Sequence, residues 1–255
     1  PSFVNLTNIE VNYAYSYGFY LSNVANLKTI TGDNIIVKNT KYAFDFWQHC
    51  KIELSNYQAI DCTYGMGYNN DAGNSYKQTP NVNIKLTGSK FIGNEYGFYY
   101  YYYTNTAYIL NLEIIDSVFE DSTKCAIYSR YYTYSNYPER PHTITLRNVE
   151  IYNCRIGVNV DSCSLYMYDC KIKGTTVEQS IYYYTYFGTL LHMENCDISS
   201  TKATYAVHIA GGQYSTAWSK NVYIYNCNFS NNKYGSFKSD TGSVNIYVTN
   251  SVFDK

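Results

Sequence analysis

The sequence predicts an all-β solenoid, a parallel β-helix of about ten coils. Three observations lead to this fold class. A repeat with spacings of 21 to 32 residues runs through the chain, its units contain short runs of alternating apolar and polar residues, and no segment shows the apolar spacing of a helix. One coil cannot bury its apolar face alone, so the coils are expected to stack. Residues 1–255 are predicted to form one domain, either a whole solenoid or a segment of a longer one.

Each repeat starts with a strand that ends at a tight turn. The predicted turn residues are all Asn, Gly or Asp, which tolerate the positive φ of such turns. They are Asn8, Gly32, Asn56, Gly88, Asp116, Asn148, Asp169, Asn195, Asn226 and Asn250. The residues two before and three after each of them are apolar, and the residue four before is apolar in every unit except the second, which has Lys28. Each unit therefore predicts a strand, a one-residue bend and a second short strand.

A small residue recurs nine to eleven positions after the turn in the first nine units. These residues are Gly18, Ala43, Gly65, Gly97, Ala126, Gly157, Ser180, Ala206 and Gly235. An apolar residue usually comes next. The pattern predicts a third strand, or a place where the backbone closely approaches another segment of the same coil.

The units at residues 191–198 (LHMENCDI) and 222–229 (VYIYNCNF) show the repeat most fully. Through these units, and over its full length, the chain resembles the right-handed parallel β-helix proteins of the pectin-lyase-like superfamily. The resemblance implies right-handed coils. It implies no single function, because that superfamily includes lyases, hydrolases, epimerases, phage tail spikes, adhesins and structural scaffolds.

The composition excludes several classes of partner. The chain has 19 Lys and Arg against 20 Asp and Glu, so it lacks the basic excess of a nucleic-acid-binding protein. No apolar run approaches the roughly 18 residues of a membrane span. Charged residues make up 15%, against about 25% in typical domains. With 34 tyrosines as well, we expect an extracellular or cell-surface protein.

The catalytic segments of polysaccharide enzymes in that superfamily do not occur in the sequence. The best carboxylate group is Glu53 and Glu113 with Lys85 between them, in one outward column on consecutive coils. Two coil steps place the carboxylates about 9–10 Å apart, at the upper edge of an inverting-glycosidase gap. We prefer a surface ladder of alternating charges. The four histidines show no ligand spacing, so no catalytic residue, metal site or cofactor is predicted.

Two sets of aromatic residues are candidate contact surfaces for a glycan or a protein partner. The first is an outward ladder on consecutive coils, formed by Tyr166, His192, Tyr223 and Tyr247. The second is the block Tyr99, Tyr100, Tyr101, Tyr102 and Tyr103, which lies in one of the longer connections between coils. A tyrosine ring and its hydroxyl suit sugar stacking and protein contacts. The alternative is that stacked tyrosines only stabilise the sheet.

Eight cysteines occur without a C-x-x-C pair: Cys50, Cys62, Cys125, Cys154, Cys163, Cys170, Cys196 and Cys227. Cys170, Cys196 and Cys227 share one column directly after the turn, where other units have Ser. A small buried residue at the bend is the simpler interpretation, and the disulfide pairing stays open. Asn5 and Asn228 lie in N-glycosylation sequons and are expected to point outward.

The function we expect is that of an extracellular structural protein. No end cap is evident in the sequence, so the solenoid ends are expected to associate head to tail into a filament or surface layer. The second candidate is a glycan-binding adhesin or spike module that uses exposed tyrosines, with a polysaccharide as partner. A polysaccharide lyase or hydrolase is the third.

Overall fold

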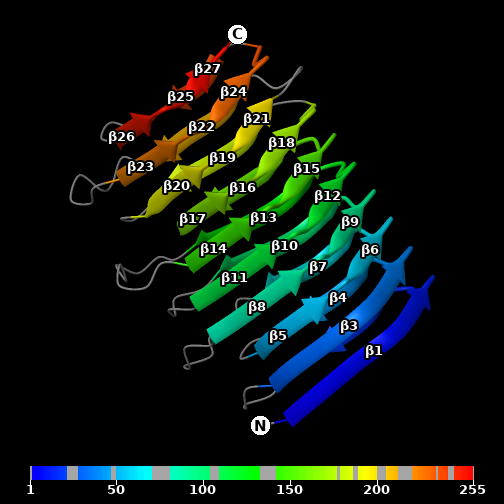
Figure 1. The fold of residues 1–255 in the computed structure, drawn as a ribbon. Coiled ribbons are helices and arrows are strands. Elements are labelled where there is room, and N and C mark those ends of the chain that lie inside the picture. The colour runs from blue at the N-terminus through cyan, green and yellow to red at the C-terminus, as the bar shows by residue number, and fades with distance from the viewer. Residues whose placement is uncertain are drawn as a thin grey trace.

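The computed structural model confirms the predicted fold class. It describes residues 2–21, 28–46, 50–70, 81–103, 109–132, 142–176, 179–185, 189–199, 205–211, 220–233, 235–240 and 244–254. In these ranges every regular element is a β-strand, and none is a helix that could span a membrane. Figure 1 shows the strands lying side by side and stacked in chain order from the N-terminus to the C-terminus.

The larger sheet, sheet A, holds the strands on both sides of the first bend. Ten of its strands lead into the bend: β1 (Ser2–Asn12), β3 (Lys28–Lys38), β5 (Cys50–Ser55), β8 (Asn81–Thr87), β11 (Ile109–Ile115), β14 (His142–Arg147), β17 (Cys163–Tyr168), β20 (Leu190–Glu194), β23 (Lys220–Tyr225) and β26 (Val244–Thr249). Of these, β1 and β3 continue through the bend. The short strands after the bend are β6 (Gln58–Ile60), β9 (Lys90–Ile92), β12 (Val118–Glu120), β15 (Glu150–Tyr152), β18 (Lys171–Lys173), β21 (Asp197–Ser199), β24 (Asn228–Ser230) and β27 (Val252–Phe253).

Sheet B closes each coil on its other side. Its nine parallel strands are β2 (Tyr17–Leu21), β4 (Tyr42–Phe46), β7 (Tyr64–Asn70), β10 (Tyr96–Tyr103), β13 (Cys125–Tyr132), β16 (Val158–Asp161), β19 (Gln179–Thr185), β22 (Tyr205–Gly211) and β25 (Gly235–Ser239). Each pairs with the strand of the next coil, so residues that are in register lie one above the other on neighbouring coils.

The predicted first bend is present, with one correction. Nine of the ten predicted turn residues have positive φ, between 49° and 60°. In the second unit the turn residue is Asn34 (φ 52°), and Gly32 was the wrong choice. Gly32 pairs with Leu6 and Leu54 and so occupies a core position. With Asn34 at the turn, the residue four before is the buried Ile30, which removes the exception at Lys28.

A second bend lies five residues after the first. Its residues also have positive φ: Tyr13, Asn39, Asp61, Gly93, Asp121, Asn153, Gly174 and Asn231. This column was not predicted, although its Asn, Asp and Gly recur at a fixed distance from the first turn. The two bends with the three-residue strand between them form one corner of each coil.

The small residues lie where sheet B approaches the short strands of sheet A. A Cβ on Gly97 would lie 2.5 Å from Phe119 Cδ1 and 2.6 Å from the Ala126 carbonyl oxygen. The pattern thus marks both a third strand and a close approach. The ninth member is Ser236 and not Gly235, because Gly235 pairs with Tyr205 one residue earlier in the register.

The core is a set of stacked columns. Phe91 and Phe119 on neighbouring coils stack with their centroids 4.5 Å apart and their planes 3° apart. All eight cysteines are buried and unpaired. The Cys170 thiol donates to the Tyr168 carbonyl oxygen at 3.2 Å, as Ser117 Oγ does to Ile115 at 2.7 Å in the same column. These contacts agree with the interpretation of a small buried residue at the bend.

The close approach at Gly97 gives a first prediction. Gly97→Ala is expected to lower the free energy of unfolding by about 1–3 kcal/mol, because its Cβ would overlap the Phe119 ring and a backbone oxygen. Urea denaturation followed by circular dichroism measures the change.

Gly67→Ala is the matched control. At Gly67 a new Cβ would have its nearest neighbour, Tyr64 Cβ, at 3.4 Å, so this variant should be as stable as the parent or slightly more stable. Equal stability of the two variants would contradict the close approach.

Candidate functional site

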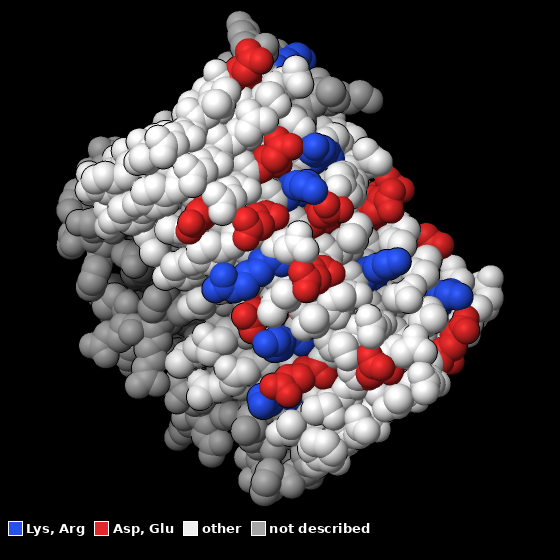
Figure 2. Space-filling view, viewed as in Figure 1, with Lys and Arg blue, Asp and Glu red and all other residues white. Residues whose placement is uncertain are grey.

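The charged column of sheet A is an ion-pair surface. Glu53, Lys85 and Glu113 are in register as predicted. Lys85 Nζ lies 3.4 Å from a Glu113 oxygen, and Lys51 Nζ lies 2.8 Å from a Glu53 oxygen. All four side chains are well exposed, and Figure 2 shows acidic and basic side chains interspersed over this face. Exposed pairs of this kind contribute little energy, and both carboxylates already have a cation beside them, as in the preferred interpretation of a surface ladder.

The predicted aromatic ladder of sheet A lies outward and in register. Tyr166 pairs with His192, His192 with Tyr223, and Tyr223 with Tyr247. The last two rings stack at 4.9 Å with their planes 10° apart. The faces of these two rings therefore cover one another, whereas the Tyr166–His192 and His192–Tyr223 pairs are tilted, with their centroids 6.2 and 6.5 Å apart. Its role in contacting a partner stays a prediction.

The tyrosine block at residues 99–103 lies on strand β10, and its side chains alternate. Tyr99 and Tyr101 are partly exposed, whereas Tyr100 points inward, is 1% exposed and packs 5.4 Å from the Tyr68 ring. The prediction of Tyr100 as a contact residue is therefore wrong, because the strand turns every second side chain into the core. The side chains of Tyr102 and Tyr103 lie outside the described residues.

The two sequon asparagines lie on sheet A. Asn5 is exposed, and its Oδ1 accepts a hydrogen bond from Thr31 at 3.0 Å. Asn228 is partly buried and donates to Asp197 Oδ1 at 3.1 Å. Glycosylation of either residue stays a prediction.

The outer face of sheet B carries tyrosines in two columns that the sequence analysis did not identify. One column stands directly before the small residues and holds Tyr17, Tyr42, Tyr64 and Tyr96; the other holds Tyr20, Tyr99 and Tyr128. We call these seven residues the tyrosine ladder. Rings within a column stack, for example Tyr42 on Tyr64 at 4.6 Å and Tyr99 on Tyr128 at 5.1 Å. The recurring tyrosine before the small residue was a usable signal.

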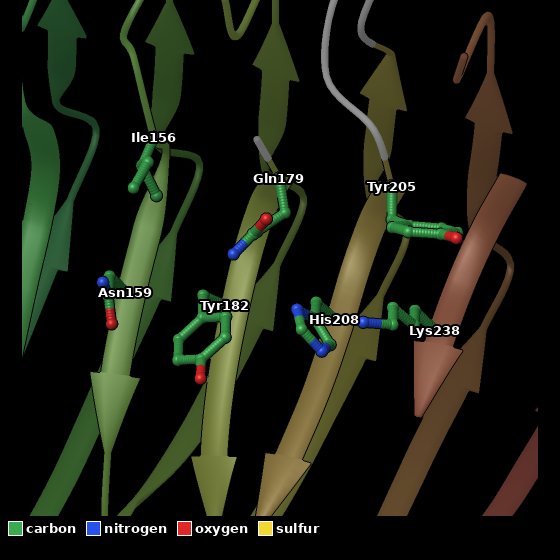
Figure 3. Close-up of a pocket in the computed structure, with 7 residues that line it drawn as sticks. All are labelled: Ile156, Asn159, Gln179, Tyr182, Tyr205, His208 and Lys238. Atoms are coloured by element: carbon green, nitrogen blue, oxygen red, sulfur yellow. The ribbon is translucent and has the colours of Figure 1, made fainter. Parts of the chain in front are cut away.

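Toward the C-terminus the same two columns open into a hollow of about 410 Å³. Here the stacked tyrosines give way to side chains of mixed chemistry. The hollow is lined by Ile156, Gln179 and Tyr205 from one column and by Asn159, Tyr182, His208 and Lys238 from the other (Figure 3). Four strands, β16, β19, β22 and β25, contribute to it together with the connection before β16.

A hydrogen-bonded group forms one side of the hollow. Asp240 accepts hydrogen bonds from His208 Nε2 and Lys238 Nζ, both at 2.7 Å. These two partners, Lys238 first, lower the pKa of Asp240, so its carboxylate is ionised and accepts both hydrogen bonds. Figure 3 shows the His208 ring between Tyr182 and Lys238.

A buried carboxylate lies beside the hollow. Asp161 ends β16, accepts a hydrogen bond from Ser162 Oγ at 2.7 Å and lies 3.6 Å from Arg130 Nε. Burial raises the pKa of Asp161 to about 6, although the Ser162 hydrogen bond and the Arg130 charge act in the opposite direction. Burial, Asp161 and Asp240 also raise the pKa of Tyr182, so this phenol keeps its proton.

The hollow therefore offers two tyrosine rings, two side-chain amides, an imidazole and an ammonium group. Searched over the described residues, the chain shows no group of three His, Cys, Asp or Glu side chains placed to hold a metal ion. This arrangement can contact an aromatic ring or the face of a sugar, and it can form several hydrogen bonds with a polar ligand.

Comparison with known families fixes the class of the fold. The family model for a right-handed β-helix region matches residues 77–253, more than two thirds of the chain. The chain belongs to this family. Searches of curated proteins and of solved structures found no match. Membership confirms the right-handed β-helix and leaves the function of this β-helix to be argued from its surface.

The buried Asp161 gives a prediction for the pH dependence of this β-helix. Its pKa is about 6 in the folded chain and near 3.8 in the unfolded chain, so the folded state holds the proton more tightly. Stability should therefore fall by the order of 2–3 kcal/mol as pH rises from about 4 through about 6. In Asp161→Asn this contribution should be absent.

Urea unfolding of both proteins at several pH values between 4 and 7 measures the difference. Because all other titrating groups are shared, only the difference between the two profiles reports on Asp161. Parallel profiles would contradict the assignment.

Proposed function

We propose that this β-helix binds a glycan in the hollow on sheet B. The observation that carries the proposal is the pairing of two tyrosine rings, Tyr182 and Tyr205, with hydrogen-bonding groups of both senses around one concave surface. A sugar has apolar C–H faces and many hydroxyls, which suit an aromatic wall beside amides and an imidazole.

The rings in the hollow differ from those of the tyrosine ladder in the side chains beside them on neighbouring coils. Tyr205 pairs in register with Gln179 and Gly235, neither of which carries a ring. Tyr182 meets His208 at an interplanar angle of 82° and does not stack on it. In the hollow, rings therefore alternate in register with residues of other chemistry, whereas in the ladder Tyr17, Tyr42, Tyr64 and Tyr96 stack on one another from coil to coil.

Size and charge narrow the class of ligand. A volume of about 410 Å³ lies in the lower part of the range of roughly 300–1,000 Å³ for small-molecule sites. Lys238 is paired with Asp240, and Arg130 with Asp161, so the nearby cations are already compensated. These features favour a neutral glycan segment of a few sugar units over a strongly anionic one.

The test starts from a glycan array and continues by titration calorimetry with the best-bound glycan. Tyr205→Ala is expected to weaken binding about tenfold or more, since loss of a ring contact and its buried area costs more than about 1.4 kcal/mol. Tyr225→Ala, an outward tyrosine beside the aromatic ladder of sheet A, is the matched control and should bind normally.

Two results would overturn this proposal. If no glycan binds the parent protein at millimolar concentration, glycan binding is rejected. If Tyr225→Ala loses binding and Tyr205→Ala keeps it, the site belongs to sheet A and not to the hollow.

A structural role through head-to-tail assembly is the second candidate, and an extracellular or cell-surface location goes with both. Exposed apolar side chains support it: Phe3 on β1 is 67% exposed, and Val252 and Phe253 on β27 are 58% and 45% exposed. A second copy stacked on these strands would bury them.

Electron microscopy of the purified chain tests this assembly. Filaments are expected, with an axial repeat of about 45–50 Å for ten coils at about 4.8 Å each. Discrete single particles at high protein concentration would reject it.

A further inference from the structure

The tyrosine ladder forms an unbroken path of phenol rings along sheet B. From Tyr20 the path runs through Tyr17 (centroid distance 4.8 Å) to Tyr42 (5.2 Å) and Tyr64 (4.6 Å). From Tyr64 it reaches Tyr99 at 4.8 Å and Tyr96 at 5.6 Å, and Tyr99 leads to Tyr128 at 5.1 Å. The path crosses five coils, a rise of about 19 Å at about 4.8 Å per coil step.

Van der Waals contact between rings of the same kind permits electron transfer between them, in addition to stabilising the sheet. All seven side chains are phenols, so a one-electron oxidation that passes from one ring to its neighbour moves between groups of the same kind. Burial raises the pKa of Tyr17, Tyr96 and Tyr128, so these phenols hold their protons at rest. The ring edges lie on the outer face of the sheet, where a released proton can pass to water.

The ladder is most open at its first coil. Tyr17 and Tyr20 are 42% and 48% exposed, whereas Tyr42, Tyr64, Tyr96, Tyr99 and Tyr128 are each covered further. A second molecule can therefore approach a radical on Tyr17 or Tyr20 more closely than a radical on any other ring of the ladder.

We propose that the tyrosine ladder conducts one-electron oxidation along the solenoid to Tyr17 and Tyr20, where two copies of the chain become joined by a dityrosine bond. The oxidant is a peroxide acting through one-electron steps. Each of two phenols loses one electron and its hydroxyl proton, the two radicals form an ortho carbon–carbon bond, and the rings regain aromaticity by moving their ring protons to the phenoxyl oxygens. Overall, two phenols and one hydrogen peroxide give one dityrosine and two waters.

The experiment places the oxidant at the far end of the ladder. Asn159 pairs with Tyr128, and all eight native thiols are buried, so Asn159→Cys gives one thiol for selective attachment of a ruthenium polypyridyl photo-oxidant. Light with persulfate as electron acceptor then oxidises Tyr128 first. We expect covalent dimers with dityrosine fluorescence, and peptide mapping should place the bond at Tyr17 or Tyr20.

The decisive variant is Tyr42→Phe in the labelled protein. Tyr42 is the ring that joins Tyr17 to Tyr64, and Phe keeps the stacking but is far harder to oxidise. The yield of dimer should fall severalfold, whereas Tyr223→Phe on sheet A should leave it unchanged. Circular dichroism checks that all variants are folded.

Equal dimer yields in the parent and in Tyr42→Phe would overturn the proposal, as would cross-links that map outside Tyr17 and Tyr20 or oxidation confined to Tyr99 and Tyr128. None of these outcomes bears on glycan binding, because no residue of the tyrosine ladder lines the hollow and glycan binding is measured on the protein without the label at Asn159.

Discussion

In the part of the chain that the structure describes, eight coils turn at two residues with positive φ that stand five positions apart. At the first bend these residues also bond to one another across coils: Asn148 Nδ2 donates to Asp116 Oδ1 at 2.7 Å, and Asn195 Nδ2 donates to Asp169 Oδ1 at 3.1 Å. An L-residue pays a conformational cost for positive φ, which Asn, Asp and Gly tolerate best. Because the bend recurs at one place in every coil, the strands on both sides of it stay in register.

The register between neighbouring coils decides which side chains contact one another. Inside the coils it places like side chains over like side chains, as with Phe91 and Phe119. Outside, it aligns ion pairs on one part of sheet A, aromatic rings on another and tyrosines along sheet B. A change of residue type in one column therefore changes the surface at that coil, because the backbone fixes the positions of the neighbouring side chains on the coils above and below.

The hollow forms where the residue types in the two outer columns of sheet B change from one coil to the next. In the first four coils one outer column of sheet B holds the stacked rings of Tyr17, Tyr42, Tyr64 and Tyr96, and in the other column Tyr99 stacks on Tyr128. From β16 onward Asn159, Gln179 and His208 interrupt the stacking, so ring surface and polar groups face the same space. The same columns thus support two different proposals: ring-to-ring transfer where stacking is continuous, and ligand contact where it is interrupted.

The sequence by itself determined the solenoid, its all-β strands, the first bend and the small-residue column, because these depend on backbone conformation and on alternation within a single coil. It placed the second turn at Gly32 because a glycine satisfies a bend and a crowded core position equally well; the register with Leu6 and Leu54 is what separates the two. It also assigned Tyr100 to the surface without fixing the phase of its strand. The tertiary structure alone decided the hollow, since Tyr182, His208 and Asp240 lie about thirty residues apart in the chain and are brought together by stacking of neighbouring coils. Local sequence encodes the shape of one coil, whereas a site on a solenoid surface is made by the register between coils.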